Sequence, residues 1–161
     1  MFIALGYLLP YFTGQIPEIG KMLCPMHIPA FLCGMICGPW YGLLCGVVMP
    51  LLRSAFAGIP VFFPSGIAMA LELGTYGMIS GLMLKYLPRK TASSYIALIV
   101  AMICGRAVSG TVNAVLMGIS DKSYTFATFL TVHFANAWPG ILLQLILIPA
   151  LIGILRRCKA I

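Results

Sequence analysis

Charged side chains are scarce in this chain, and acidic ones are nearly absent. Only 8% of its 161 residues are charged, and three of them are Asp or Glu. A soluble globular domain carries roughly 25% charged residues because water must wet its surface. Since 61% of the residues are hydrophobic, the few charges cannot cover a water-facing exterior. The composition excludes an ordinary soluble domain and predicts an exterior that faces lipid.

Signatures of ATP and metal chemistry are also missing. The sequence contains no Gly-rich loop that ends in Lys-Ser or Lys-Thr, the pattern that holds nucleotide phosphates. Cys33, Cys37, Cys45 and Cys104 lie in apolar stretches with no His or carboxylate at ligand spacing. We interpret these thiols as small buried apolar side chains and expect neither a metal nor a cofactor.

The apolar stretches are long enough to predict membrane helices, which need about 20 mostly apolar residues each. We expect an all-α, polytopic membrane protein with six transmembrane helices in one compact bundle, formed by a single domain over residues 1–161. No basic residue precedes the first segment, which argues against a signal peptide. The predicted spans are Met1 to Thr13, Pro25 to Cys37, Tyr41 to Ala57, Gly66 to Tyr86, Tyr95 to Leu116 and Phe126 to Leu155.

The basic residues predict the orientation of these spans, because Lys and Arg near helix ends stay in the cytoplasm. Two basic clusters would share the cytoplasmic face: Lys85, Arg89 and Lys90 after the fourth span, and Arg156, Arg157 and Lys159 after the sixth. Both termini are then cytoplasmic, and the outer loops are Gly14 to Leu23, Gly58 to Ser65 and Gly118 to Thr125. The net charge of +7 thus reflects topology, and no nucleic-acid partner is expected because the cations form no groove-sized patch.

Glycines recur at four-residue intervals in the second to fourth spans. The two rows are Gly34, Gly38, Gly42 and Gly46, and then Gly77 and Gly81. Small residues at this spacing let helix backbones approach closely in lipid. Pro39 interrupts the first row, so Gly38 and Pro39 are expected to form a tight cytoplasmic turn between two helices that share a packing surface.

Polar residues at membrane depth indicate a ligand site. A charge in the centre of a spanning helix costs about 2.5 to 3.5 kcal/mol and therefore needs a partner or a function. With the predicted topology, nearly all of these residues fall in the outer half of the membrane, and Arg106 lies near the middle. Seven residues separate Arg106 from Asn113, so these two share one helix face. The predicted substrate-binding residues are Arg53, Glu72, Tyr76, Arg106, Asn113, His133, Asn136 and Trp138.

A purely structural interpretation of the same residues stays open. Glu72 would neutralise Arg53 or Arg106, and the Asn and His side chains would bridge helices. Two arginines against one carboxylate leave a positive charge, however, which suits an anionic ligand. A carboxylate-bearing vitamin such as pantothenate would meet this charge, and its hydroxyl and amide groups would match the Asn, His and Trp side chains.

Four stretches of the sequence together resemble a known family. They are LCPMHIPAFLCGMICG at residues 23–38, PLLRS at 50–54, FPSGIAMALELGTYG at 63–77 and GRA at 105–107. They resemble substrate-binding S components of energy-coupling factor (ECF) transporters, and are most similar to the group of pantothenate-type carriers. The resemblance covers nearly the whole chain.

The resemblance implies a bundle of six helices in the bacterial cytoplasmic membrane that captures a vitamin from outside. The implied lids are the loops 14–23 and 58–65, the second of which carries Phe62 and Phe63. The implied partners are a transmembrane coupling protein and two ABC ATPases, so this chain is not expected to be an enzyme. The family's docking motif on the first helix is Ala-xxx-Ala, and here Ala4 alone fits it. Either a few residues precede Met1, or docking uses other small residues such as the row from Gly34 to Gly46.

The sequence also leaves other functions open. Riboflavin, folate and cobalamin are carried by related S components, so the resemblance leaves the vitamin open. A standalone ion-coupled transporter or a channel would use Glu72 and the arginines as a relay or filter, but the chain shows no internal repeat of the kind that many carriers have. An intramembrane enzyme would depend on His133 with a serine such as Ser109, and nothing in the sequence brings them together.

The predicted orientation can be tested by cysteine labelling in intact cells. A cysteine at Arg89, in the loop from Leu87 to Ser94, should react with a membrane-impermeant reagent only after permeabilisation. A cysteine at Lys122, in a loop predicted to lie outside, should react in intact cells. Labelling of position 89 from outside would contradict the assignment.

Overall fold

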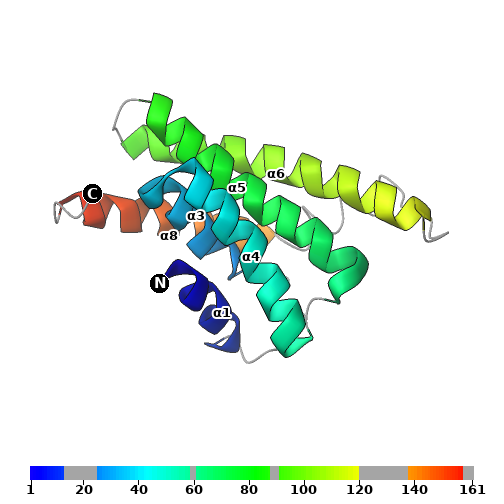
Figure 1. The fold of residues 1–161 in the computed structure, drawn as a ribbon. Helices are drawn as coiled ribbons and strands as arrows, with labels where there is room; N and C mark the ends of the chain where they lie inside the picture. Colours follow the sequence, from blue (N-terminus) through cyan, green and yellow to red (C-terminus); the bar gives the residue numbers. More distant parts are fainter. Residues whose placement is uncertain (13–24, 59–60, 88–90, 120–137, 158–161) are drawn as a thin grey trace.

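The computed structural model describes residues 1–12, 25–58, 61–87, 91–119 and 138–157, and every regular element in this part of the chain is helical (Figure 1). The all-α prediction is therefore confirmed for these residues. The elements are α1 (Phe2–Phe12), α3 (His27–Cys37), α4 (Pro39–Ala57), a π-helical turn η1 (Phe62–Gly66), α5 (Ile67–Tyr86), α6 (Thr91–Ile119) and α8 (Trp138–Arg157).

Four of the described helices are long and apolar enough to cross a membrane. They are α4, α5, α6 and α8, with candidate spans Pro39–Ala57, Ile67–Tyr86, Ala92–Leu116 and Trp138–Leu155. In the first two predicted spans, the structure shows helices of 11 residues each. At 1.5 Å per residue such a helix is about 16 Å long, which is shorter than the hydrocarbon core of about 30 Å. Of the six predicted crossings, four therefore correspond to described helices that are long enough to span a membrane.

Helix boundaries differ from the predicted ones where no residue forces a break. Helix α6 begins at Thr91, four positions before the predicted start at Tyr95, because the intervening Ala and Ser residues continue the helix. Residues 126–137 of the sixth predicted span lie outside the described residues. Helix α4 ends at Gly58, whose φ of 67° is a left-handed conformation that suits glycine.

Helix α5 is the element that the others pack around. It makes its most extensive contacts with α4, α6 and α3, and it runs between α4 and α6 in Figure 1. Helix α1 packs on α3 and α4, while α8 packs on α6 and α3. The buried apolar core is formed mainly by α3, α5 and α6, with Phe31, Leu73 and Leu98 fully buried.

The glycine rows allow α3, α4 and α5 to touch through their backbones. A Cβ atom added to Gly42 would lie 2.5 Å from the Cα of Gly34 and 2.6 Å from the carbonyl oxygen of Gly77. Between α3 and α4, Gly38 alone makes the turn, with a φ of 103°. The predicted turn and the packing interpretation are confirmed. Because Gly34, Gly42 and Gly46 are buried against α5, this row is not open to a docking partner.

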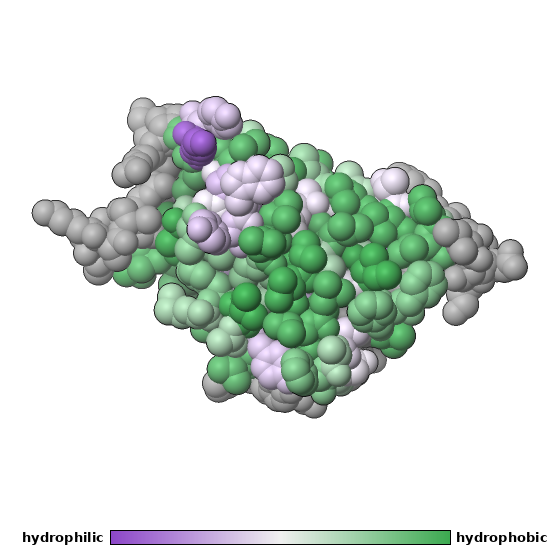
Figure 2. Space-filling model, in the orientation of Figure 1, coloured by the Kyte–Doolittle hydropathy of each residue, from purple (hydrophilic) through white to green (hydrophobic). Residues whose placement is uncertain are grey.

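The outer surface of the bundle is apolar, as a lipid-facing protein requires. Large exposed apolar side chains occur on every long helix, among them Leu44, Ile103 and Ile146. Figure 2 shows an almost continuous hydrophobic face, with its most hydrophilic patch at the end of the molecule where α5 ends and α6 begins. This polar end of the face is the end that the sequence predicts to lie in the cytoplasm.

The close helix packing predicts that one methyl group at Gly42 will destabilise the bundle. Gly42→Ala should lower the free energy of unfolding by about 1 to 3 kcal/mol, because the added Cβ overlaps two backbones that cannot move apart without loss of contact. Thermal unfolding in detergent would measure the effect. Gly153→Ala on α8 is the matched control, since an added Cβ there meets nothing within 4 Å. Equal stability of the two variants would contradict this packing.

Candidate functional site

A buried carboxylate stands at the centre of the polar residues in the bundle. Glu72 is the sixth residue of α5, and its side chain is 13% exposed. Tyr76 lies one helical turn further on, so its hydroxyl reaches back and donates a hydrogen bond of 2.6 Å to Oε1 of Glu72. Tyr76 itself is fully buried. The helix that carries the acid therefore also holds it in place.

Helix α3 brings an imidazole to this carboxylate. His27 is the first residue of α3 and is 7% exposed. Its Nε2 lies 3.8 Å from Oε1 of Glu72, within ion-pair distance. Its ring lies 5.2 Å from that of Tyr76, which also stacks on Phe31 at 4.8 Å. Because α3 begins beside the first turns of α5, its first residue meets the acid directly.

Helix α6 closes the other side of the cluster with three polar residues on one face. Arg106 interacts with the Tyr76 hydroxyl, and Ser109 interacts with the Glu72 carboxylate. Asn113 Nδ2 donates to the Ser109 carbonyl at 2.9 Å and approaches its hydroxyl at 3.4 Å. On this face Arg106 and Ser109 meet α5, and Asn113 is joined to them through Ser109. Gly105 permits this approach, since a Cβ there would collide with the Tyr76 ring.

The structure gathers four of the eight predicted site residues in this cluster. Glu72, Tyr76, Arg106 and Asn113 belong to the polar cluster, whereas Arg53 is buried near the end of α4. Trp138 is the first residue of α8 and is exposed. The predicted residues His133 and Asn136 lie outside the described residues.

The predicted lid residues lie on η1. Phe62 and Phe63 are both exposed, and Phe63 interrupts the helical turn with extended backbone angles. The turn is closed by a hydrogen bond of 2.9 Å from the Gly66 N–H to the Val61 carbonyl. Two exposed aromatic rings at the entrance of α5 are available to cover a ligand, and their role as a lid remains a prediction.

Sequence reasoning missed two members of the cluster, His27 and Ser109. His27 is an ionisable residue in an apolar segment between Pro25 and Pro29, and this signal alone marks it as a candidate. Ser109 lies between Arg106 and Asn113 on the same helix face, so the helical spacing that paired those two also includes it.

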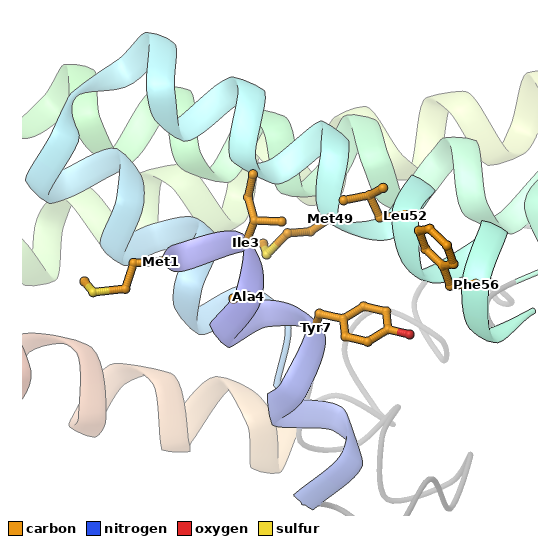
Figure 3. A pocket seen from close by; sticks show the side chains of 7 residues that line it. All are labelled: Met1, Ile3, Ala4, Tyr7, Met49, Leu52 and Phe56. Carbon is orange, nitrogen blue, oxygen red and sulfur yellow. The ribbon is translucent and has the colours of Figure 1, made fainter.

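An apolar groove lies apart from this cluster. The groove has a volume of about 590 Å³ and lies between α1 and α4 (Figure 3). Its walls carry no charged side chain and comprise Met1, Ile3, Ala4, Tyr7, Met49, Leu52 and Phe56. Ala4, the residue that fits the docking motif, is part of its wall. The cluster around Glu72 suits a polar ligand better, because it offers an acid, an imidazole, a guanidinium, two hydroxyls and an amide.

Comparison with protein families identifies the chain. The model of the family described as "ECF transporter, substrate-specific component" matches residues 1–152. The chain belongs to this family. It is therefore a membrane-embedded S component, the subunit that binds the small-molecule substrate and works with the partners of the ECF module. No curated protein and no solved structure matches the chain.

The hydrogen bond between Tyr76 and Glu72 predicts a specific loss of stability in this S component. Tyr76→Phe removes the hydroxyl that serves a buried carboxylate and should lower the free energy of unfolding by about 1 to 3 kcal/mol. Thermal unfolding in detergent would show the loss. Tyr86→Phe changes an exposed position at the end of α5. It should change the free energy of unfolding by only about a few tenths of a kcal/mol. Matching melting temperatures in both variants would show that the Tyr76 hydroxyl contributes nothing.

Proposed function

We propose that this S component binds a small carboxylate-bearing vitamin, with pantothenate as the best candidate. It would capture the vitamin at the outer face and deliver it through a transmembrane coupling protein driven by two ABC ATPases. The proposal includes six crossings with both termini in the cytoplasm. The observation that carries it is the buried polar cluster formed by α3, α5 and α6 in a subunit of this family.

The position of the cluster supports a ligand that arrives from outside. Glu72 lies about 8 Å along α5 from its start at Ile67. The cation distribution predicts that this start is at the outer face, so the acid lies in the outer half of the membrane. His27, at the start of α3, is in contact range of Glu72 and shares this depth. Ionisable groups in this position are costly in a bilayer and indicate a functional site.

The balance of charge supports an anionic ligand. Among the described residues, Glu72 is the one acid, while the residues Arg53 and Arg106 are only 9% and 8% exposed. Among these buried groups, two arginines stand against one carboxylate, so the count of formal charges favours an anion. A ligand carboxylate would balance this count, and a planar carboxylate can accept two parallel hydrogen bonds from an arginine.

Two other assignments would use the same residues differently. If the ligand is riboflavin, folate or cobalamin, the same cluster would bind it, and other groups of the ligand would meet these side chains. A standalone ion-coupled transporter or a channel would use Glu72, His27 and Arg106 to pass ions or protons. Reconstitution into liposomes separates these classes: an S component alone should retain solute outside, whereas a channel or carrier should let it pass.

Calorimetry with the purified protein tests the charge of the ligand. We expect pantothenate to bind, and the analogue whose carboxylate is replaced by a hydroxymethyl group to bind at least about tenfold more weakly, because it cannot pair with the buried cations. The two ligands are otherwise identical. Binding of riboflavin without any response to pantothenate would refute the proposed vitamin and leave the family assignment intact.

A further inference from the structure

One buried polar atom of the cluster has no hydrogen-bond partner. Among the described residues, two buried side-chain atoms lack a partner, Nδ1 of His27 and Oγ of Ser94. Most buried polar side-chain atoms in proteins are hydrogen-bonded. Ser94 is twelve residues from Arg106 on α6, about 18 Å along the helix, so it lies away from the cluster. His27, in contrast, contacts Glu72 and Tyr76 of the cluster.

The neighbouring acid determines what Nδ1 can do. Nε2 of His27 faces Oε1 of Glu72 at 3.8 Å, and an ionised carboxylate offers only lone pairs. A lone pair on Nε2 would be repelled, so Nε2 carries a proton. Nδ1 is then an acceptor in the neutral ring and a donor in the imidazolium. In either form Nδ1 has a hydrogen-bonding capacity that no described residue uses.

The surrounding residues restrict the orientation of the imidazole. It lies against the Tyr76 ring at 5.2 Å with an angle of 47° between the two planes. The Tyr76 hydroxyl already donates to Glu72, and Met26, the residue before α3, offers no side-chain cap. A ring held by an acid on one side and an aromatic face on another has little freedom to turn Nδ1 toward another partner.

We propose that His27 determines ligand specificity, by forming at Nδ1 a hydrogen bond with a hydroxyl or amide group of the bound vitamin. This inference rests on the proposed function and adds a requirement to it: the ligand must carry such a group as well as an anionic one. A site with a buried polar atom that only the ligand can pair rejects analogues that lack the matching group. His27 thus selects by hydrogen bonding, and Arg106 selects by charge.

Two substitutions separate the two nitrogens of the ring. The amide of His27→Gln can occupy the place of Nε2 and keep the contact with Glu72, but it leaves nothing at Nδ1. The shorter amide of His27→Asn can place its oxygen near Nδ1 but cannot reach Glu72. Ser94→Ala is the matched control, because it removes the other unpartnered buried atom at a distance from the cluster.

The experiment measures affinity by calorimetry and the melting temperature without ligand, using pantothenate, riboflavin, folate and cobalamin as probes. For the vitamin that binds the parent protein, His27→Gln should weaken binding by about tenfold or more with little change in melting temperature. His27→Asn should recover part of that affinity while melting earlier. Ser94→Ala should bind like the parent.

Each contrary outcome has a distinct meaning. If the parent binds a vitamin and His27→Gln binds it equally well, the role of His27 is refuted while the proposed function stands. If the parent binds none of the four vitamins, the proposed function fails and this inference fails with it. If His27→Gln does not fold, analogues of the vitamin that each lack one hydroxyl or amide group are tested on the parent, and unchanged affinity for all of them would overturn the inference.

Discussion

Direct backbone contact between α3, α4 and α5 is the constraint on which the rest of the bundle depends. In lipid, apolar surface gains nothing by leaving the solvent, so helices associate through close packing and polar contacts. Gly34, Gly42 and Gly77 supply that closeness at one crossing, where even a single Cβ would overlap a neighbouring backbone. The turn at Gly38 sets α4 directly after α3, so both helices reach α5 as one hairpin.

The polar cluster follows from this packing. Once α3 is held against α5, its first residue His27 stands beside Glu72, although 45 positions separate them in the sequence. On the opposite side, Gly105 lets α6 approach the Tyr76 ring and brings Arg106 and Ser109 within reach of the same residues. The small residues thus allow the helices to approach closely, and this approach brings the polar and ionisable side chains together.

Local patterns in the sequence predict the helices well because apolar length and helical spacing are local properties. The spans at α4 and α5, the turn at Gly38 and the common face of Arg106 and Asn113 all follow from such patterns. The pairing of His27 with Glu72 does not, because it depends on the depth at which α3 begins and on the side from which α3 meets α5. A hydropathy profile contains neither quantity, and the 11-residue length of α3 cannot be inferred from an apolar run that continues beyond it.

The hydrogen bond that Tyr76 donates to Glu72 from the same helix has a consequence for the entropy of recognition. Both partners are one turn apart on α5, so their contact does not require another helix or a ligand to form. The rotamer of the acid is selected when the helix folds, and the conformational freedom of that side chain is already lost before an encounter occurs. A molecule that enters the bundle meets a rigid carboxylate, and its affinity is not reduced by the ordering of a flexible one.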